Sequence, residues 1–162
     1  MTKKTFPRRI YPDAAAFLHD LKYLMSNRSL IRSAMRSTIS AEFRERLMLT
    51  VTEVNGCKYC RYAHARMALK AGLLPQELDQ FLAGNFPSET PAQEIPALLY
   101  AQHWAETDAR PEPETIEKIT TLYGQEISNA IHIILRMIRM GNLMGNTLDY
   151  VLFNLSFGKL GV

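Results

Sequence analysis

The chain has 162 residues, of which 47% are hydrophobic, and its 19 Lys and Arg against 16 Asp and Glu give a formal net charge of +3. This length supports one hydrophobic core, so we expect a single domain over residues 1–162. The basic residues form no dense stripe interleaved with aromatic side chains, which argues against a nucleic-acid-binding protein.

The N-terminal residues carry positive charge but lack the other parts of a signal peptide. No apolar segment and no small-residue cleavage site follows them. The longest apolar stretches, near 130–135 and 151–153, are far shorter than the ~20 residues of a membrane span. We therefore expect a soluble, cytoplasmic protein without a membrane partner.

The first part of the chain predicts three helices in succession. Asp13 is a suitable N-cap for a helix with apolar residues at helical spacing, and a short helix follows over 30–38. Ser40 is a second N-cap, and it starts a helix that ends at Asn55 and Gly56. The buried stripe of this third helix is expected to contain Phe43, Leu47 and Val51.

Glycine and proline mark the boundaries of the next helices. A helix over about 57–71 precedes Gly72, which is a typical C′ residue, and Pro75 suits the first position of a short helix. The helix after that starts either at a capping box that begins with Thr90 or at Pro96.

The last third of the chain is apolar and helical. A helix that begins after two prolines ends near Gly124, and a long helical region fills 126–157, with Gly141 or Gly145 as a candidate break point. Segments with strict polar and apolar alternation are missing from the whole sequence. The predicted fold class is therefore all-α.

The chain has two cysteines, Cys57 and Cys60, which lie three positions apart. Such a pair cannot join distant parts of a fold, and in a reducing compartment it is usually metal-binding or redox-active. On a helix, Cys57, Cys60 and His64 fall within an arc of roughly 60°. A first-turn position favours a thiolate at Cys57, and His64 is placed to take a proton from Cys60 directly or through water.

Glu45 lies on the preceding predicted helix. The turn at Asn55-Gly56 folds that helix back, so we expect the Glu45 carboxylate to reach His64 and orient its imidazole. Taken alone, Glu45 is equally compatible with a solvated helix face that carries intrahelical ion pairs. Its offset from Cys57 is what favours a proton relay.

Glu45, eleven residues, Cys57-Lys-Tyr-Cys60, three residues and His64 form a pattern that resembles the signature of the alkyl hydroperoxidase D family, within the carboxymuconolactone decarboxylase superfamily. The similarity in helical order covers about residues 40–110. The resemblance implies a helical bundle that assembles as trimers or hexamers and reduces hydroperoxides through a cycling disulfide. It implies that Cys60 is peroxidatic, that Cys57 resolves it, and that Glu45 and His64 relay protons.

The resemblance also bears on partners. No bound cofactor is expected, and an external dithiol on a lipoyl-bearing or thioredoxin-like protein must reopen the disulfide, because the chain has no third cysteine and no nucleotide-binding glycine signature. One residue departs from the family pattern. Tyr59 stands where such peroxidases can carry His, and a phenol with a pKa near ~10 cannot replace that His as a base.

Three alternatives remain open for the cysteine pair. It could be buried without chemistry, or it could hold zinc with His64 and Glu45 in a redox-sensing or zinc-binding interaction protein, although no second Cys/His knuckle accompanies it. The chain could also be a decarboxylase-type lyase on the same scaffold. That branch of the superfamily is not expected to use a cysteine pair.

Other conspicuous side chains have simpler interpretations. His103 and His132 are expected to be packed or hydrogen-bonded structural residues. A row of methionines is expected in the core or a subunit interface, and a row of arginines on a solvated surface, with docking of an acidic reductant as the alternative. The two rows are Met137, Met140 and Met144, and Arg28, Arg32 and Arg36.

Overall fold

Helices form all the regular secondary structure between residues 5 and 161, the part of the chain that the computed structural model describes. No strand occurs among those residues, so the predicted all-α class is confirmed. The helices are α1 (Ala14–Ser26), α2 (Arg28–Ser33), the π-helical turn η1 (Ala34–Thr38), α3 (Ala41–Asn55), α4 (Lys58–Ala71), α5 (Pro75–Leu82), α6 (Ile95–Glu106) and α7 (Pro113–Leu155).

The predicted caps set the ends of the first helices. Asp13 accepts a hydrogen bond from the backbone N–H of Ala16 at 2.8 Å, and the Ser40 hydroxyl accepts one from Phe43 at 3.1 Å. Gly56, with φ of 70°, and Gly72, with φ of 117°, end α3 and α4 in the left-handed region. Each cap satisfies backbone groups that the helix itself leaves unpaired.

Two predicted helix boundaries differ from the structure. The helix expected over 30–38 begins earlier, at Arg28, and its second half winds as the π-helical turn η1. The capping box at Thr90 is wrong, because turns follow it and α6 begins at Ile95 with Pro96 in its first turn. Proline fits there because the first N–H groups of a helix have no partner within the helix.

Helix α7 is interrupted once, at Gly124, and it is continuous at Gly141 and Gly145. Gly124 has φ of 77° and ψ of 164°, so the predicted end of a helix near this residue is confirmed. The break expected at Gly141 or Gly145 is wrong, since the helix runs through both residues. Glycine is costly in a helix but does not itself end one, and at these two positions it allows α7 to approach α4 closely.

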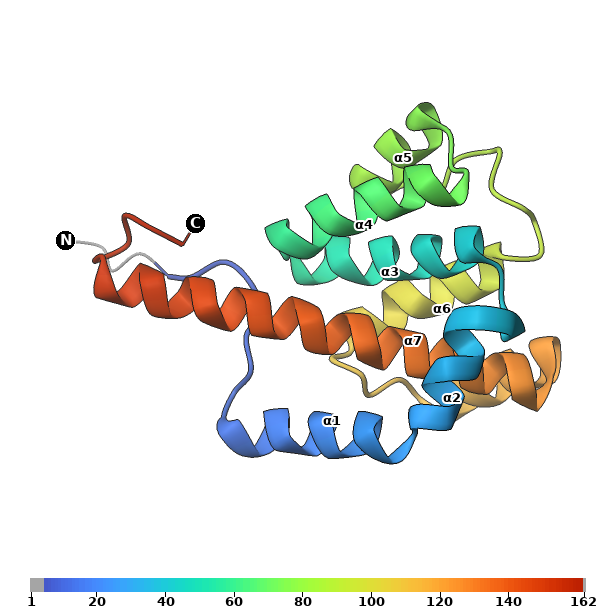
Figure 1. Cartoon of the computed structure of the whole chain (residues 1–162), viewed down its shortest axis with the longest axis horizontal. Helices are drawn as coiled ribbons and strands as arrows, with labels where there is room; N and C mark the ends of the chain where they lie inside the picture. The colour runs from blue at the N-terminus through green and yellow to red at the C-terminus, as the bar shows by residue number, and fades with distance from the viewer. Residues whose placement is uncertain (1–4, 162) are drawn as a thin grey trace.

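Helix α3 lies at the centre of the bundle, in contact with α4, α6 and α7 (Figure 1). The predicted stripe of Phe43, Leu47 and Val51 is buried, with Leu47 and Val51 fully enclosed. Burial of each such side chain contributes about 1.5–3 kcal/mol, so this helix is the main anchor of the fold. From α7 the core receives Ala130, Ile131, Ile133, Ile134 and Leu135.

A buried ionic cluster fixes α3 against α5 and the start of α6. Arg46 is 7% exposed, and its Nε lies 2.6 Å from Oε1 of Glu77 while its Nη1 lies 3.0 Å from Oε2 of Glu94. Because all three groups are enclosed, removal of one partner would leave an unpaired buried charge. The cluster therefore fixes the register of three helices.

The segment before α1 runs along the C-terminal part of α7 (Figure 1). Arg8 donates to Oδ2 of Asp149 at 2.9 Å and also to the carbonyl of Gly161. Arg9 bonds the carbonyls at the end of α6, at Ala105 and Glu106. Within residues 5–161, no helix is both long enough and apolar enough to cross a membrane.

Candidate active site around the cysteine pair

Cys57 occupies the N-cap of α4, one position before the first turn in which it was expected. Gly56, in the left-handed region, reverses the chain between α3 and α4. The Sγ of Cys57 accepts the backbone N–H of Cys60 at 3.4 Å, as the oxygen of a capping side chain would. The start of α4 is therefore built around a sulfur.

The two sulfurs face each other as free thiols. The Sγ atoms of Cys57 and Cys60 are 3.0 Å apart, whereas a disulfide bond requires about 2.05 Å. Cys57 is 1% exposed, and Cys60 is partly exposed. The structure thus contains the reduced pair, with Cys60 as the more exposed residue.

The negative charge of the pair lies on Cys57. The hydrogen bond between the two sulfurs, with the backbone N–H groups of Cys60 and Tyr59 and the charge of Arg8, outweighs burial and lowers the pKa of Cys57 to about 6. The pKa of Cys60 is raised by the hydrogen bond with Cys57 and by partial burial. At neutral pH the pair is accordingly one thiolate and one thiol.

Glu45 reaches His64 across the α3–α4 hairpin. Its carboxylate is buried, with 2% of the residue exposed, and Oε2 lies 2.8 Å from Nδ1 of His64. The other oxygen lies 3.4 Å from Nε of Arg44. This contact fixes the imidazole ring and leaves its Nε2 for another partner, although no hydrogen bond joins His64 to either sulfur in the described part of the chain.

A family model, the carboxymuconolactone decarboxylase family, matches residues 21–107. The chain belongs to the carboxymuconolactone decarboxylase family. No curated protein and no solved structure matches it. The matched segment contains α3 and α4, and therefore Glu45, Cys57, Cys60 and His64.

Helix α7 lies outside the segment matched to the carboxymuconolactone decarboxylase family, yet it forms one wall of the site. A Cβ atom placed on Gly145 would lie 2.9 Å from Sγ of Cys57, and one on Gly141 would lie 3.9 Å from Sγ of Cys60. Both glycines appeared in the sequence as candidate helix breaks. The signal that they are packing positions is their separation of four residues, which places them on one face of a helix.

Asn142 is a second contribution of α7 that sequence reasoning missed. It is fully buried, accepts a hydrogen bond from Nδ2 of Asn55 at 3.1 Å and donates one to Oγ1 of Thr52 at 3.1 Å. A hydrogen bond between Asn142 and Cys60 partly offsets the rise in the pKa of that thiol. The amide therefore connects the end of α3 to the cysteine pair.

Tyr59 is held away from the role of a base. Its hydroxyl donates to Oδ1 of the buried Asp149 at 2.7 Å, and this bond raises the pKa of the phenol. The same carboxylate lies 2.9 Å from Nη1 of Arg8 and 3.3 Å from Nζ of Lys58. Tyr59 thus anchors the start of α4 to α7 and the N-terminal segment.

The remaining sequence candidates lie outside the α3–α4 hairpin that carries the sulfurs. His103 is hydrogen-bonded to Glu112 at 2.6 Å and His132 to the hydroxyl of Tyr100 at 2.8 Å, as structural histidines would be. No group of three or more His, Cys, Asp and Glu side chains within residues 5–161 could hold a metal ion. The arginine row is exposed. In the methionine row, Met137 and Met140 are partly buried and Met144 is 47% exposed.

Proposed function

We propose that this family member is a thiol oxidoreductase that reduces hydroperoxides by cycling a disulfide between Cys57 and Cys60. The observation that carries the proposal is the pairing of two sulfurs 3.0 Å apart with a buried carboxylate–imidazole contact of 2.8 Å on the adjoining helices. A structural role for the pair would not need a thiolate. A carboxylate oriented on an imidazole is a typical device for moving protons beside a nucleophile.

The oxidative step takes place at Cys60, because it is the more exposed cysteine of the pair. Its proton passes through water to His64, whose ring Glu45 orients, and the resulting thiolate attacks the distal oxygen of the hydroperoxide. The O–O bond breaks, the sulfur is oxidised to a sulfenic acid, and the departing alkoxide takes the proton back as an alcohol. The raised pKa of Cys60 makes this step dependent on the relay.

Resolution follows from the ionisation of Cys57. Its thiolate attacks the sulfur of the Cys60 sulfenic acid, the S–S bond forms, and hydroxide leaves and is protonated to water. The sulfurs need to approach by about 1 Å to reach the disulfide length of about 2.05 Å. No movement of a helix is required for a change of this size.

The reductive step requires an external dithiol, of the lipoyl-bearing or thioredoxin-like kind. Its thiolate attacks the sulfur of the more exposed Cys60 and expels Cys57, which is the better leaving group because its pKa is lower. The second thiol of the reductant then releases the mixed disulfide. We place this cycle in the cytoplasm, in a homo-oligomer of three or six chains, and the exposed apolar side chains of α7, Leu148 and Leu155, support subunit contacts.

The test is peroxide consumption driven by dihydrolipoamide, with a stopped-flow measurement of oxidation of the reduced pair. We expect oxidation much faster than that of a free thiol, complete loss of turnover in Cys60→Ser, and a sulfenic acid trapped at Cys60 in Cys57→Ser. Full turnover in Cys60→Ser would overturn the proposal. Retained activity on a lactone substrate after both cysteines are replaced would instead assign the chain to the lyase branch.

A further inference from the structure

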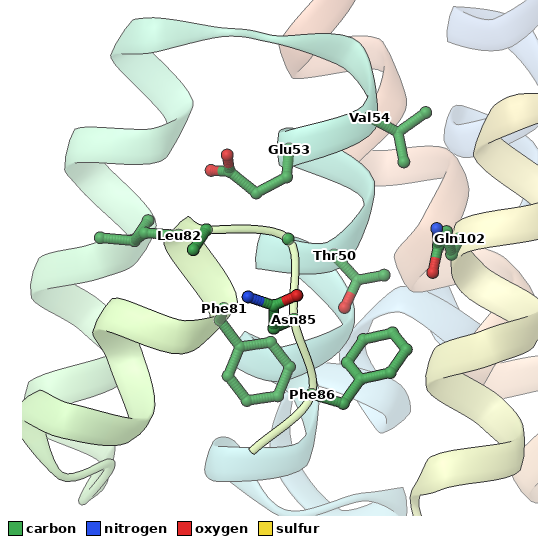
Figure 2. A pocket seen from close by; sticks show the side chains of 10 residues that line it. Thr50, Glu53, Val54, Phe81, Leu82, Asn85, Phe86 and Gln102 are labelled. Carbon is green, nitrogen blue, oxygen red and sulfur yellow. The ribbon is translucent and has the colours of Figure 1, made fainter.

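A cavity of about 300 Å³ opens between α3, the end of α5 and α6, on a different set of residues from the cysteine pair. Figure 2 shows side chains from α3, from α6 and from the loop after α5 around this space. The size lies within the range of small-molecule sites. The side chains that matter for its chemistry are Glu53, Val54, Phe81, Asn85, Phe86 and Gln102.

Glu53 gives the cavity an unsatisfied acceptor. Its Oε1 atom is buried and has no hydrogen bond, although Nε of Arg61 lies 3.4 Å away at ion-pair distance. Burial raises the pKa of Glu53 in spite of that cation. The second oxygen of this carboxylate, Oε2, is not among the enclosed atoms and makes no hydrogen bond within residues 5–161, so it can accept an N–H group from a bound molecule.

The rest of the lining combines apolar walls with polar side chains. Thr50 donates to the carbonyl of Arg46 and Gln102 donates to Glu106, which leaves the amide of Asn85 for a ligand. The rings of Phe81 and Phe86 lie 5.9 Å apart, and Val54 closes the side toward α3. Asn85 stands in the same space as Glu53 and makes no side-chain hydrogen bond within residues 5–161 (Figure 2). Such walls favour a flat apolar body, and the two polar groups call for a donor toward Glu53 and an acceptor toward Asn85.

Charge selects among ligands of this shape. A carboxylate would face the Glu53 carboxylate without a donor of its own, and an ammonium group would compete with Arg61, which is already beside Glu53. A neutral primary amide supplies both the N–H donor and the C=O acceptor. We propose that this cavity binds small aromatic carboxamides, with the amide N–H on Oε2 of Glu53 and the amide oxygen on Asn85.

The cavity is a separate site from the proposed thiol chemistry. Arg61 follows Cys60 in α4, but its guanidinium points away to the carbonyl of Leu82, at 2.6 Å, and to Glu53. None of the four residues of the cysteine site lines the cavity. Binding can therefore be measured on the reduced protein whether or not it turns over peroxide.

The test uses benzamide as the probe on the full chain, followed by backbone and side-chain amide NMR signals. We expect saturable shifts centred on Val54, Gly84 and Asn85, with affinity in the millimolar range that suits so small a molecule. Benzoate has the same ring and size but no N–H donor, so it should cause no saturable shift. Benzoate binding equal to that of benzamide would overturn the assigned role of Glu53.

Two variants complete the test. Glu53→Gln should weaken benzamide binding about tenfold, the loss typical of a hydrogen bond to a charged group, whereas Glu126→Gln on exposed α7 should leave it unchanged. Val54→Phe fills the cavity and should abolish binding in a protein whose circular dichroism remains helical. Equal affinity in all variants, or shifts that depend on protein concentration and not on benzamide, would refute the site and indicate a contact between copies.

Discussion

The α3–α4 hairpin and the C-terminal half of α7 meet at the cysteine pair with different kinds of side chain. The hairpin contributes the candidate reactive groups: two sulfurs, an imidazole and a carboxylate, all within residues 45–64. Helix α7 contributes glycine and amide groups, at Gly145 and Asn142, that set the space and the hydrogen bonds around those sulfurs. Reactivity is thus local in sequence, whereas the shape of the site is not.

This difference between the hairpin and α7 predicts that substitutions in the two regions have different effects. The family match ends at residue 107, before α7 begins, so the family assignment rests on the hairpin side of the site. Changes in the hairpin should affect whether the chemistry proceeds. Changes in α7 should affect how closely the sulfurs approach and how the start of α4 is held.

The largest effect is expected from Glu45→Gln in the hairpin. The amide keeps the size of the side chain but cannot balance the charge of a protonated imidazole, so peroxide turnover should fall about 100-fold. Stopped-flow oxidation of the reduced pair measures this. Glu42→Gln, on the same helix, is the control and should keep the wild-type rate; equal rates in the two variants would exclude a relay through Glu45.

Next in size is a matched pair of glycine substitutions in α7. Gly145→Ala places a Cβ 2.9 Å from Sγ of Cys57, so this sulfur must leave its present position beside Cys60, disulfide formation should slow and stability should fall by about 1–3 kcal/mol. Gly141→Ala meets Cys60 at an ordinary 3.9 Å and should stabilise the protein by about 0.5–1 kcal/mol through helix propensity. Urea unfolding measures both; similar values for the two variants would show that α7 does not confine the pair.

A smaller effect concerns the ionisation of Cys57. Thiolate absorbance of the reduced protein should rise around pH 6, and Arg8→Gln should move this transition to higher pH, because the guanidinium lowers the pKa of Cys57. The folded pKa lies below the unfolded value of about 8.5. The stabilisation is therefore complete above that value and is lost as pH falls toward 6.

This prediction is checked by comparing reduced wild type with Cys57→Ser. The stability difference between them should grow from pH 6 to about 8.5 in favour of the wild type. Arg9→Gln is the control for Arg8→Gln, since Arg9 bonds the end of α6 instead of Asp149. A single transition near pH 8.5 in the wild type would contradict the assignment of the thiolate.

The smallest effect is expected from Tyr59→Phe. The ring remains in place, but Asp149 loses the hydroxyl donor at 2.7 Å and keeps Arg8 and Lys58. Stability should decrease slightly, and the rate of oxidation should change less than in Gly145→Ala. A loss of turnover comparable to that of Glu45→Gln would mean that the phenol takes part in proton transfer.

Most of the hairpin could be predicted from the sequence, because the signals there are local. Ser40, Gly56 and Gly72 mark helix ends by their own backbone preferences, and the spacing of Cys57, Cys60 and His64 fixes a common helix face. The approach of Glu45 to His64 also followed, since one tight turn joins their helices. The roles of these residues in a reaction stay predictions.

The contribution of α7 could not be predicted in the same way. Gly145 and Asn142 are about 85 residues away from Cys57 and Cys60 in sequence, and glycine in a helix predicts a break more readily than a close contact. Thr90 and Pro96 predicted two different starts for the same helix, and α6 begins at Ile95 with Pro96 in its first turn. Glu53 has no feature in the sequence that distinguishes it from an acid on a helix surface, because the loop residues that share its cavity follow α5, about 30 residues later in the chain.

The hydrogen bonds of Arg8 make the acidity of a thiol depend on a stretch of chain that belongs to no helix. A protease that cuts between residues 8 and 13 would leave every helix of the bundle intact and still remove this cation. Two preparations with the same circular dichroism would then differ in thiol reactivity. Intact mass is therefore the quality control that matters before any kinetic comparison of this protein.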